Sequence, residues 1–177
     1  MPPIHQQRID RFLEAGAAAA TTTDQGRALE DLICYLFESI PGIIVTERNV
    51  LNAFGTEEVD VAFWNDQNRQ GAWFLPTILL VECKNWSRPV GSTEVASFVR
   101  RLENRGLDHG FLVASQGVTG KPGELTDANF QITTALKDGI KVIVIDRYDI
   151  QALHTSGDLV VLIKRKLCRL AATGTCI

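Results

Sequence analysis

Hydrophobic residues change their spacing along this chain, and the changes mark out its elements. Before residue 42 they recur every three or four positions, which is typical of amphipathic helices. From residue 42 to residue 84 the period is two, which is typical of strands, and beyond it the two patterns alternate. The pattern predicts helices over 4–20, 25–40, 92–106 and 124–139, strands over 42–51, 57–64, 77–84, 110–115 and 140–146, and a short and a long helix within 148–172.

The order of these elements predicts the fold class. Strands that follow one another and then alternate with helices are typical of an α/β protein, so we expect a sandwich in which a central mixed five-stranded sheet is flanked by helices. Thr23 or Asp24 is expected to cap the second helix. We expect an N-terminal helical extension over residues 1–23 and one domain over residues 24–177. The extension either packs on that domain or on a partner, or is solvated.

Composition narrows the class of protein. Of the 177 residues, 45% are hydrophobic and 22% are charged, which is ordinary for a globular chain. No apolar run reaches the roughly 18 residues that span a membrane, and the start lacks the pattern of a signal peptide, so we expect a cytoplasmic protein. The spacing of cysteines and histidines argues against a zinc site or a disulfide framework. A formal net charge of -3 argues against a basic coat for nucleic acids, but it allows a local basic patch or a partner that supplies affinity.

The third predicted strand, TILLVECK, is apolar on both faces until it ends in charged residues. Alternation places Glu82 and Lys84 on one face and Cys83 on the other, where it is expected to be a small buried residue. Taken alone, the pattern is explained equally well by a strand end that emerges into water. The preceding strand changes the balance, because Asp60 lies in the middle of EEVDVAFW, where an aspartate is unfavourable without a partner.

If these two strands are neighbours, their acids converge. Asp60 and Glu82 would then bind a hard cation through oxygen and stabilise the charge of a displacement at phosphate. Lys84 would orient the attacking water or help to deprotonate it, and a pKa lowered by burial would favour the second role. Glu30 of the second helix lies on or at the edge of its apolar stripe and is a candidate third acid, although most helix glutamates are simply solvated.

Glu30 in GRALEDLI, Asp60 in EVDVAF and Glu82-Cys83-Lys84 in VECKNW together resemble the PD-(D/E)xK nuclease superfamily, and most of all its Mrr-like restriction endonuclease catalytic domains. The resemblance runs from the second helix to the fifth strand and implies a restriction-endonuclease-like fold. It implies that Asp60, Glu82 and the backbone carbonyl of Cys83 bind Mg²⁺, with Mn²⁺ as a substitute. It makes Lys84 the catalytic lysine and Glu30 a further metal or water ligand.

The same resemblance implies a metal-dependent DNA endonuclease of restriction, defence or repair type. Cutting both strands needs two active sites, which implies a homodimer or a partner subunit that supplies DNA recognition. Two alternatives stay open: a nuclease-fold subunit that binds DNA or protein without cutting, and a structure-selective junction resolvase. Candidate DNA contacts near the predicted site are Asn85, Trp86, Arg88, Arg100, Arg101 and Lys121.

Overall fold

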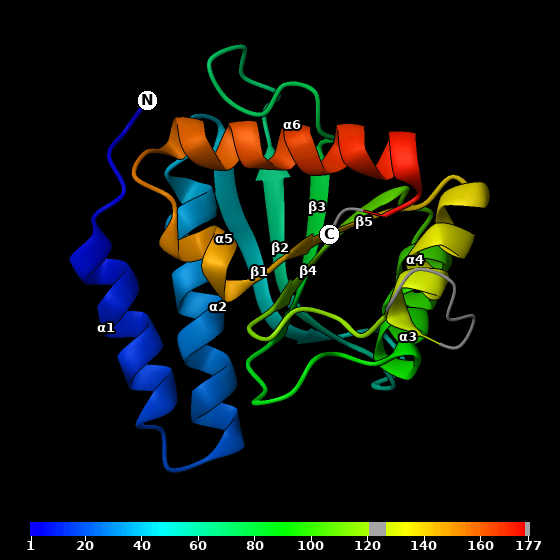
Figure 1. Cartoon of the computed structure of the whole chain (residues 1–177), viewed down its shortest axis with the longest axis horizontal. Helices are drawn as coiled ribbons and strands as arrows, with labels where there is room; N and C mark the ends of the chain where they lie inside the picture. Colours follow the sequence, from blue (N-terminus) through cyan, green and yellow to red (C-terminus); the bar gives the residue numbers. More distant parts are fainter. Residues whose placement is uncertain (121–126, 176–177) are drawn as a thin grey trace.

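The computed structural model describes residues 1–120 and 127–175 of the chain. Figure 1 shows a sheet with helices on both of its faces. In chain order the elements are α1 (Gln6–Ala17), α2 (Thr22–Glu38), β1 (Ile43–Leu51), β2 (Glu58–Asn65), β3 (Ile78–Lys84), α3 (Ser92–Asn104), β4 (His109–Ala114), α4 (Ala128–Lys137), β5 (Lys141–Ile145), α5 (Arg147–Gln151) and α6 (Ser156–Thr173).

The strands form one sheet in the order β1-β2-β3-β4-β5. β1, β2 and β3 pair antiparallel, because no helix separates them along the chain. β3, β4 and β5 pair parallel, because α3 and α4 carry the chain back to the same end of the sheet. This mixed five-stranded sheet with flanking helices confirms the predicted fold class.

Two hydrophobic cores lie on the two faces of the sheet. The first core contains residues of α2, α5 and α6, with α1 packed on the outer side of α2, and the second contains residues of α3 and α4 together with Leu170 of α6. In β3, Val81 and Cys83 belong to the first core and Leu80 belongs to the second. Both faces of this strand are therefore buried, which explains why it is apolar throughout until its charged end.

The N-terminal helices α1 and α2 pack side by side (Figure 1). Ile9 of α1 is fully buried and belongs to the same core as α2. The cap of α2 is Thr21, whose side chain accepts a hydrogen bond from the backbone N–H of Asp24 at 3.1 Å. The predicted caps, Thr23 and Asp24, are therefore wrong, since both lie inside the first turn. Three consecutive threonines offer the same capping chemistry, so the sequence does not say which one is used.

The helix predicted over residues 124–139 is described from Ala128 onward. Asp127 caps it by accepting a hydrogen bond from the backbone N–H of Phe130 at 2.7 Å. Residues 124–126 and the candidate DNA contact Lys121 lie outside the described residues. In the described part of the chain, no helix has the length and apolar character needed to cross a membrane.

Helix α3 lies very close to β4 at Gly110. A β-carbon at this position would lie 2.6 Å from Leu102 and 2.7 Å from Phe98, nearer than packed side chains tolerate. Both of these α3 residues are buried. Their neighbour Arg101 extends from the helix to the end of the sheet where β2 begins and β3 ends.

Candidate active site

Strands β2 and β3 bring Asp60 and Glu82 to the same edge of the sheet. The two strands pair antiparallel from Trp64 to Val61, where Val61 faces Val81. One residue further on, the Asp60 carboxylate accepts a hydrogen bond from the backbone N–H of Cys83 at 2.7 Å. The Asp60 side chain thus takes over the contact between the strands where their backbone pairing ends, directly beside Glu82.

The Asp60 carboxyl group has an abnormal proton affinity. Burial, and after it the negative charge of Glu82, raise the pKa of Asp60 to about 7, although the hydrogen bond from Cys83 opposes the change. The protein therefore holds two carboxyl groups so close together that a negative charge on one disfavours a negative charge on the other.

Glu82 is buried and is neutralised by two cationic side chains. It is 4% exposed. One of its oxygens, Oε1, lies 2.7 Å from Nζ of Lys84 and 2.7 Å from a terminal guanidinium nitrogen of Arg101. Such pairing is what makes a buried carboxylate tolerable, because an unpaired charge at this depth would cost several kcal/mol.

Lys84 lies at the end of β3 with its ammonium group against Glu82. Burial by itself would lower the pKa of Lys84, but the charge of Glu82, its hydrogen bond and the charge of Asp60 raise the pKa above its ordinary value. The lowered pKa that would favour a role as a base is therefore absent. A permanently charged ammonium group instead suits Lys84 to orienting water and stabilising negative charge.

Glu30 lies on the buried side of α2, as its helical spacing predicts. It is 6% exposed. Its carboxylate accepts a hydrogen bond from the Asn49 side chain at 2.9 Å, and Arg48 lies 3.5 Å from the same oxygen. Its neighbour Asp31 points away and pairs with Arg48 at 2.7 Å. Glu30 therefore sits in its own polar contact with β1.

Arg48 and Asn49 contact the candidate residue Glu30, and sequence analysis singled out neither of them. Asn49 has a φ of 50°, in the left-handed region that asparagine tolerates better than most residues. This backbone conformation interrupts the regular strand and accompanies the side-chain contact with Glu30. The only signal in the sequence is the polar run Thr46-Glu47-Arg48-Asn49 inside a predicted strand.

Cys83 and Asn85 have structural contacts. Cys83 is buried in the core beside α2, on the opposite face of β3 from Glu82, as predicted. The Asn85 side chain donates a hydrogen bond to the Gln25 carbonyl at 2.8 Å and accepts one from the Ser115 hydroxyl at 2.7 Å. Asn85 therefore ties the end of β3 to α2 and to the end of β4, and its predicted contact with DNA stays a prediction.

The remaining candidate DNA contacts differ in how accessible they are. The side chain of Arg101 is only 14% exposed and is held by Glu82, and its predicted contact with DNA stays a prediction. Arg100 is exposed on the outer side of α3. Arg88 is exposed as well and stacks on the Trp86 ring at 4.5 Å. Arg88, Trp86 and Arg100 stay candidates for contact with a DNA backbone.

The donor set fits a divalent cation at Asp60 and Glu82. Both supply the carboxylate oxygens that Mg²⁺ prefers, and a bound cation would balance the second negative charge that burial and Glu82 disfavour on Asp60. Within the described ranges, no three His, Cys, Asp or Glu side chains form a group that could hold a metal, so Glu30 does not complete a three-acid cluster. Mg²⁺ needs no such cage, since it commonly binds one or two carboxylates together with water and substrate phosphate.

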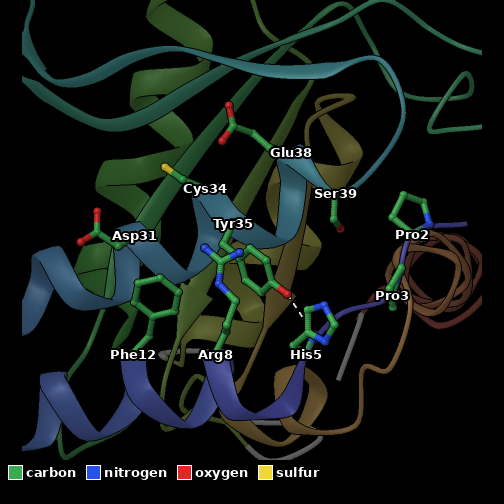
Figure 2. A pocket seen from close by; sticks show the side chains of 10 residues that line it. All are labelled: Pro2, Pro3, His5, Arg8, Phe12, Asp31, Cys34, Tyr35, Glu38 and Ser39. Carbon is green, nitrogen blue, oxygen red and sulfur yellow. Dashed lines mark hydrogen bonds between the residues drawn. The ribbon is translucent and has the colours of Figure 1, made fainter.

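A pocket elsewhere on the molecule is unrelated to these acids. Figure 2 shows it between α1, α2 and the N-terminal segment, with Arg8 above the Tyr35 ring at 4.0 Å. Burial raises the pKa of the lining residue Cys34 to about 11, so its thiol stays protonated and unreactive at neutral pH. The pocket is lined by none of the four acids and bases predicted for catalysis, Glu30, Asp60, Glu82 and Lys84.

Comparison with known protein families identifies most of the chain. A family model described as a restriction endonuclease, the Mrr-type catalytic domain, matches residues 23–154. A search of curated proteins finds no match. The matched range includes all five strands and the site built around Asp60, Glu82 and Lys84. The chain therefore belongs to the Mrr-like restriction endonucleases of the PD-(D/E)xK superfamily and carries their nuclease domain.

Proposed function

We propose that this protein is a divalent-metal-dependent DNA endonuclease. One observation carries the proposal: in a chain of the restriction endonuclease family, a buried pair of carboxyl groups on adjacent strands, Asp60 and Glu82, lies against the Lys84 ammonium group. Carboxylates of this kind bind hard cations, and a neighbouring ammonium group stabilises the negative charge of a phosphodiester during displacement.

Each residue has a distinct part in the proposed reaction. Asp60, Glu82 and the backbone carbonyl of Cys83 would hold Mg²⁺, or Mn²⁺ in its place. When bound, the ion supplies positive charge to the phosphate oxygens and activates water. Lys84, protonated at neutral pH, orients the attacking water and stabilises the developing negative charge. Glu30 is one of the groups that raise the pKa of Asp60, and it is proposed as a further ligand of the attacking water or of the metal.

The proposed substrate is DNA, cut within the chain in restriction, defence or repair. Arg88 and Arg100 are exposed cations that follow the catalytic strand β3 in sequence, and they are proposed to contact the phosphate backbone. A formal net charge of -3 supports modest DNA affinity for one copy. We therefore propose a homodimer or a partner subunit that adds DNA recognition and a second site for the second strand.

The test is a cleavage assay with purified protein. Supercoiled plasmid and linear single-stranded DNA are incubated in Mg²⁺, in Mn²⁺ and in EDTA, with Glu82→Ala in parallel. Nicking or linearisation of the plasmid that needs the metal and is lost in the variant is the expected result. Cleavage that persists in EDTA, or in Glu82→Ala, would contradict the proposal. Binding of DNA without cleavage in any metal would favour a nuclease-fold binding subunit, and a preference for branched DNA would favour a junction resolvase.

Lys84→Ala separates catalysis from folding. We expect cleavage to fall by at least about 100-fold, because the charge that faces the phosphate is lost. We expect the free energy of unfolding to change by less than about 1 kcal/mol, because Glu82 keeps Arg101 as a partner. Plasmid cleavage and urea unfolding measure the two effects. Lys166→Ala is the matched control, since it removes a lysine that lies 2.7 Å from Asp149, and it should leave cleavage intact.

A further inference from the structure

Arg101 connects the two strands that carry the proposed metal ligands. One terminal guanidinium nitrogen lies 2.7 Å from Oε1 of Glu82 on β3. The other donates a hydrogen bond to the backbone carbonyl of Glu58 at the start of β2, at 2.8 Å. The buried Nε of Arg101 has no hydrogen-bond partner in the described structure. Of the two contacts, the charge pair with Glu82 is the stronger, because both partners are ionised, whereas the Glu58 carbonyl is neutral.

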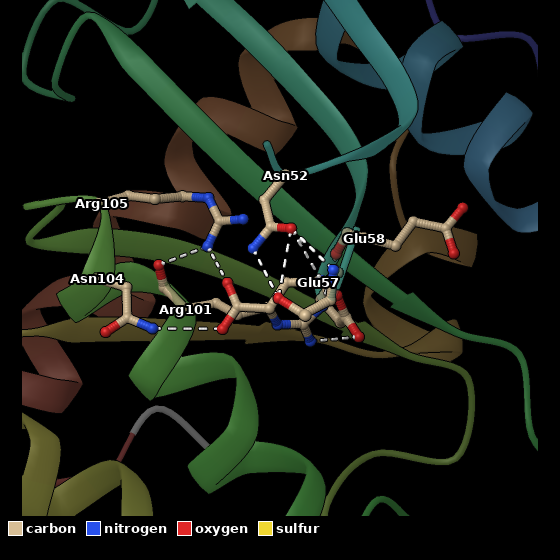
Figure 3. A network of polar contacts seen from close by, with 8 residues as sticks. Asn52, Glu57, Glu58, Arg101, Asn104 and Arg105 are labelled. Carbon is tan, nitrogen blue, oxygen red and sulfur yellow. Dashed lines mark hydrogen bonds and ion pairs between the residues drawn. The ribbon is translucent and has the colours of Figure 1, made fainter. Parts of the chain in front are cut away.

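The anchoring of α3 does not depend on that charge pair. Figure 3 shows that the end of α3 is held by other contacts with Glu57. Arg105 lies 2.7 Å from one Glu57 oxygen, and the Asn104 side chain donates a hydrogen bond to the other at 3.3 Å. The Glu57 backbone N–H donates in turn to the Asn52 side chain at 3.4 Å. Helix α3 and the segment that joins β1 to β2 are thus connected independently of Glu82. The Arg101–Glu82 pair is therefore available for a different role.

Both cations beside Glu82 contact the same oxygen atom. Nζ of Lys84 and the guanidinium of Arg101 each lie 2.7 Å from Oε1. A divalent cation that uses Glu82 would bring two more positive charges next to these two, which is unfavourable in a poorly solvated site. A phosphodiester of DNA carries the negative charge that relieves this repulsion, and guanidinium groups bind phosphate oxygens well.

We infer that Arg101 is a positioning residue that competes with the divalent cation for Glu82, so that cation binding becomes coupled to DNA binding. Without DNA, Arg101 keeps Glu82 paired and weakens cation binding. With DNA, the phosphate balances the positive charge and the cation binds more tightly. This inference rests on the proposed function, since it needs Asp60 and Glu82 to be the cation site.

The test measures Mn²⁺ affinity by calorimetry, which does not depend on cleavage. Wild-type protein and Arg101→Gln are titrated with Mn²⁺ alone and in the presence of a DNA duplex with phosphorothioate linkages. We expect Arg101→Gln to bind Mn²⁺ about fivefold or more tightly without DNA, because the competing charge is gone. We expect the duplex to increase the Mn²⁺ affinity of the wild type by a similar factor, and that of the variant by much less.

Three further variants define what each result means. Arg101→Lys keeps the charge and should bind Mn²⁺ within about twofold of the wild type. Arg105→Gln breaks the neighbouring Glu57 contact without touching Glu82, and it should leave Mn²⁺ affinity unchanged. Should Arg101→Gln fail to fold by circular dichroism, Arg101→Met replaces it, since it keeps an aliphatic chain for packing.

An unchanged or weaker Mn²⁺ affinity in the folded neutral variant would overturn the inference and leave Arg101 as a structural tie. An equal gain in Arg101→Lys, or a wild-type Mn²⁺ affinity that the duplex does not change, would also overturn it. Failure of the proposed function looks different. In that case wild-type protein binds no Mn²⁺ with or without DNA, or binds it equally well as Glu82→Gln.

Discussion

At the scale of single residues, the charge state of Asp60 dominates the site. Its pKa is raised to about 7 by burial and by Glu82, whereas an unfolded aspartate titrates near 3.8. Around neutral pH the metal-free protein therefore holds Asp60 partly protonated. A cation must displace that proton before it binds, so cation affinity should rise between pH 6 and pH 8, and cleavage at limiting Mg²⁺ should follow it.

The same shift makes stability depend on pH. The folded protein binds the Asp60 proton more tightly than the unfolded chain does. This residue therefore costs no stability below about pH 4, and the cost grows as the pH rises until it is complete above about pH 7. At pH 8 in EDTA, Asp60→Asn should therefore be more stable than the wild type and unfold at a higher temperature. The gain in the free energy of unfolding should be at most about 4 kcal/mol. The difference should shrink towards pH 4. Thermal unfolding across this pH range measures it.

Asp158→Asn is the control with the opposite sign. Hydrogen bonds from the backbone N–H groups of His154 and Thr155 lower the pKa of Asp158, so its charged form stabilises the fold above that pKa and the stabilisation is lost as pH falls. Its replacement should destabilise the protein at pH 8. A wild-type protein that becomes no less stable between pH 4 and pH 8 relative to Asp60→Asn would contradict the assignment of a raised pKa to Asp60.

At the scale of elements, the placement of α3 decides the electrostatics of the site. The helix reaches the sheet closely only because Gly110 of β4 has no side chain. That contact brings Arg101 within 2.7 Å of Glu82. The helix after the catalytic strand therefore contributes charge to the site, in addition to covering one face of the sheet.

Gly110→Ala tests this packing. The added methyl group would meet Leu102 and Phe98 at less than 3 Å, so we expect a loss of about 1–3 kcal/mol in the free energy of unfolding, measured in urea. Gly26→Ala is the control, because Gly26 lies in α2 with its nearest neighbour, Glu30, at 3.9 Å. It should be neutral or stabilise the helix by up to about 1 kcal/mol. Equal effects of the two changes would contradict close packing at Gly110.

At the scale of the whole molecule, α1 is part of the main hydrophobic core. The family match begins at residue 23, beyond this helix. Even so, Ile9 and Leu13 are buried with residues of α2, and the backbone N–H of Ile4 bonds to the carbonyl of His154 at 2.8 Å. A division of the chain at residue 23 stays a prediction, and these contacts show that its two parts share one core.

Ile9→Ala measures how much α1 contributes. Ile9 is 0% exposed, so we expect its truncation to cost about 2–5 kcal/mol in unfolding free energy. Asp10→Ala, on the exposed side of the same helix, should change stability by less than about 0.5 kcal/mol. Urea unfolding of both variants is the measurement. Two equally small changes would show that α1 is only loosely attached.

Much of the fold was predictable because it depends on local periodicity. A period of two in EEVDVAFW and TILLVECK indicates strands, and a period near 3.6 indicates helices, whatever the tertiary structure. Alternation within TILLVECK also predicted that Cys83 faces the core on the opposite side from Glu82, because a strand has only two faces. The end of a helix is less predictable, as the cap at Thr21 shows, because neighbouring residues compete on nearly equal terms.

By itself, the sequence determined the order of the elements, the mixed sheet and the identity of the acids and the lysine at its edge. Only the tertiary structure decided which charges meet there. Arg101 pairs with Glu82, Asn49 with Glu30, and the pKa of Lys84 is raised, whereas burial alone would have lowered it. The physical reason is range: periodicity acts between residues a few positions apart, whereas electrostatic contacts join residues that are distant in sequence and depend on how closely helix and sheet pack.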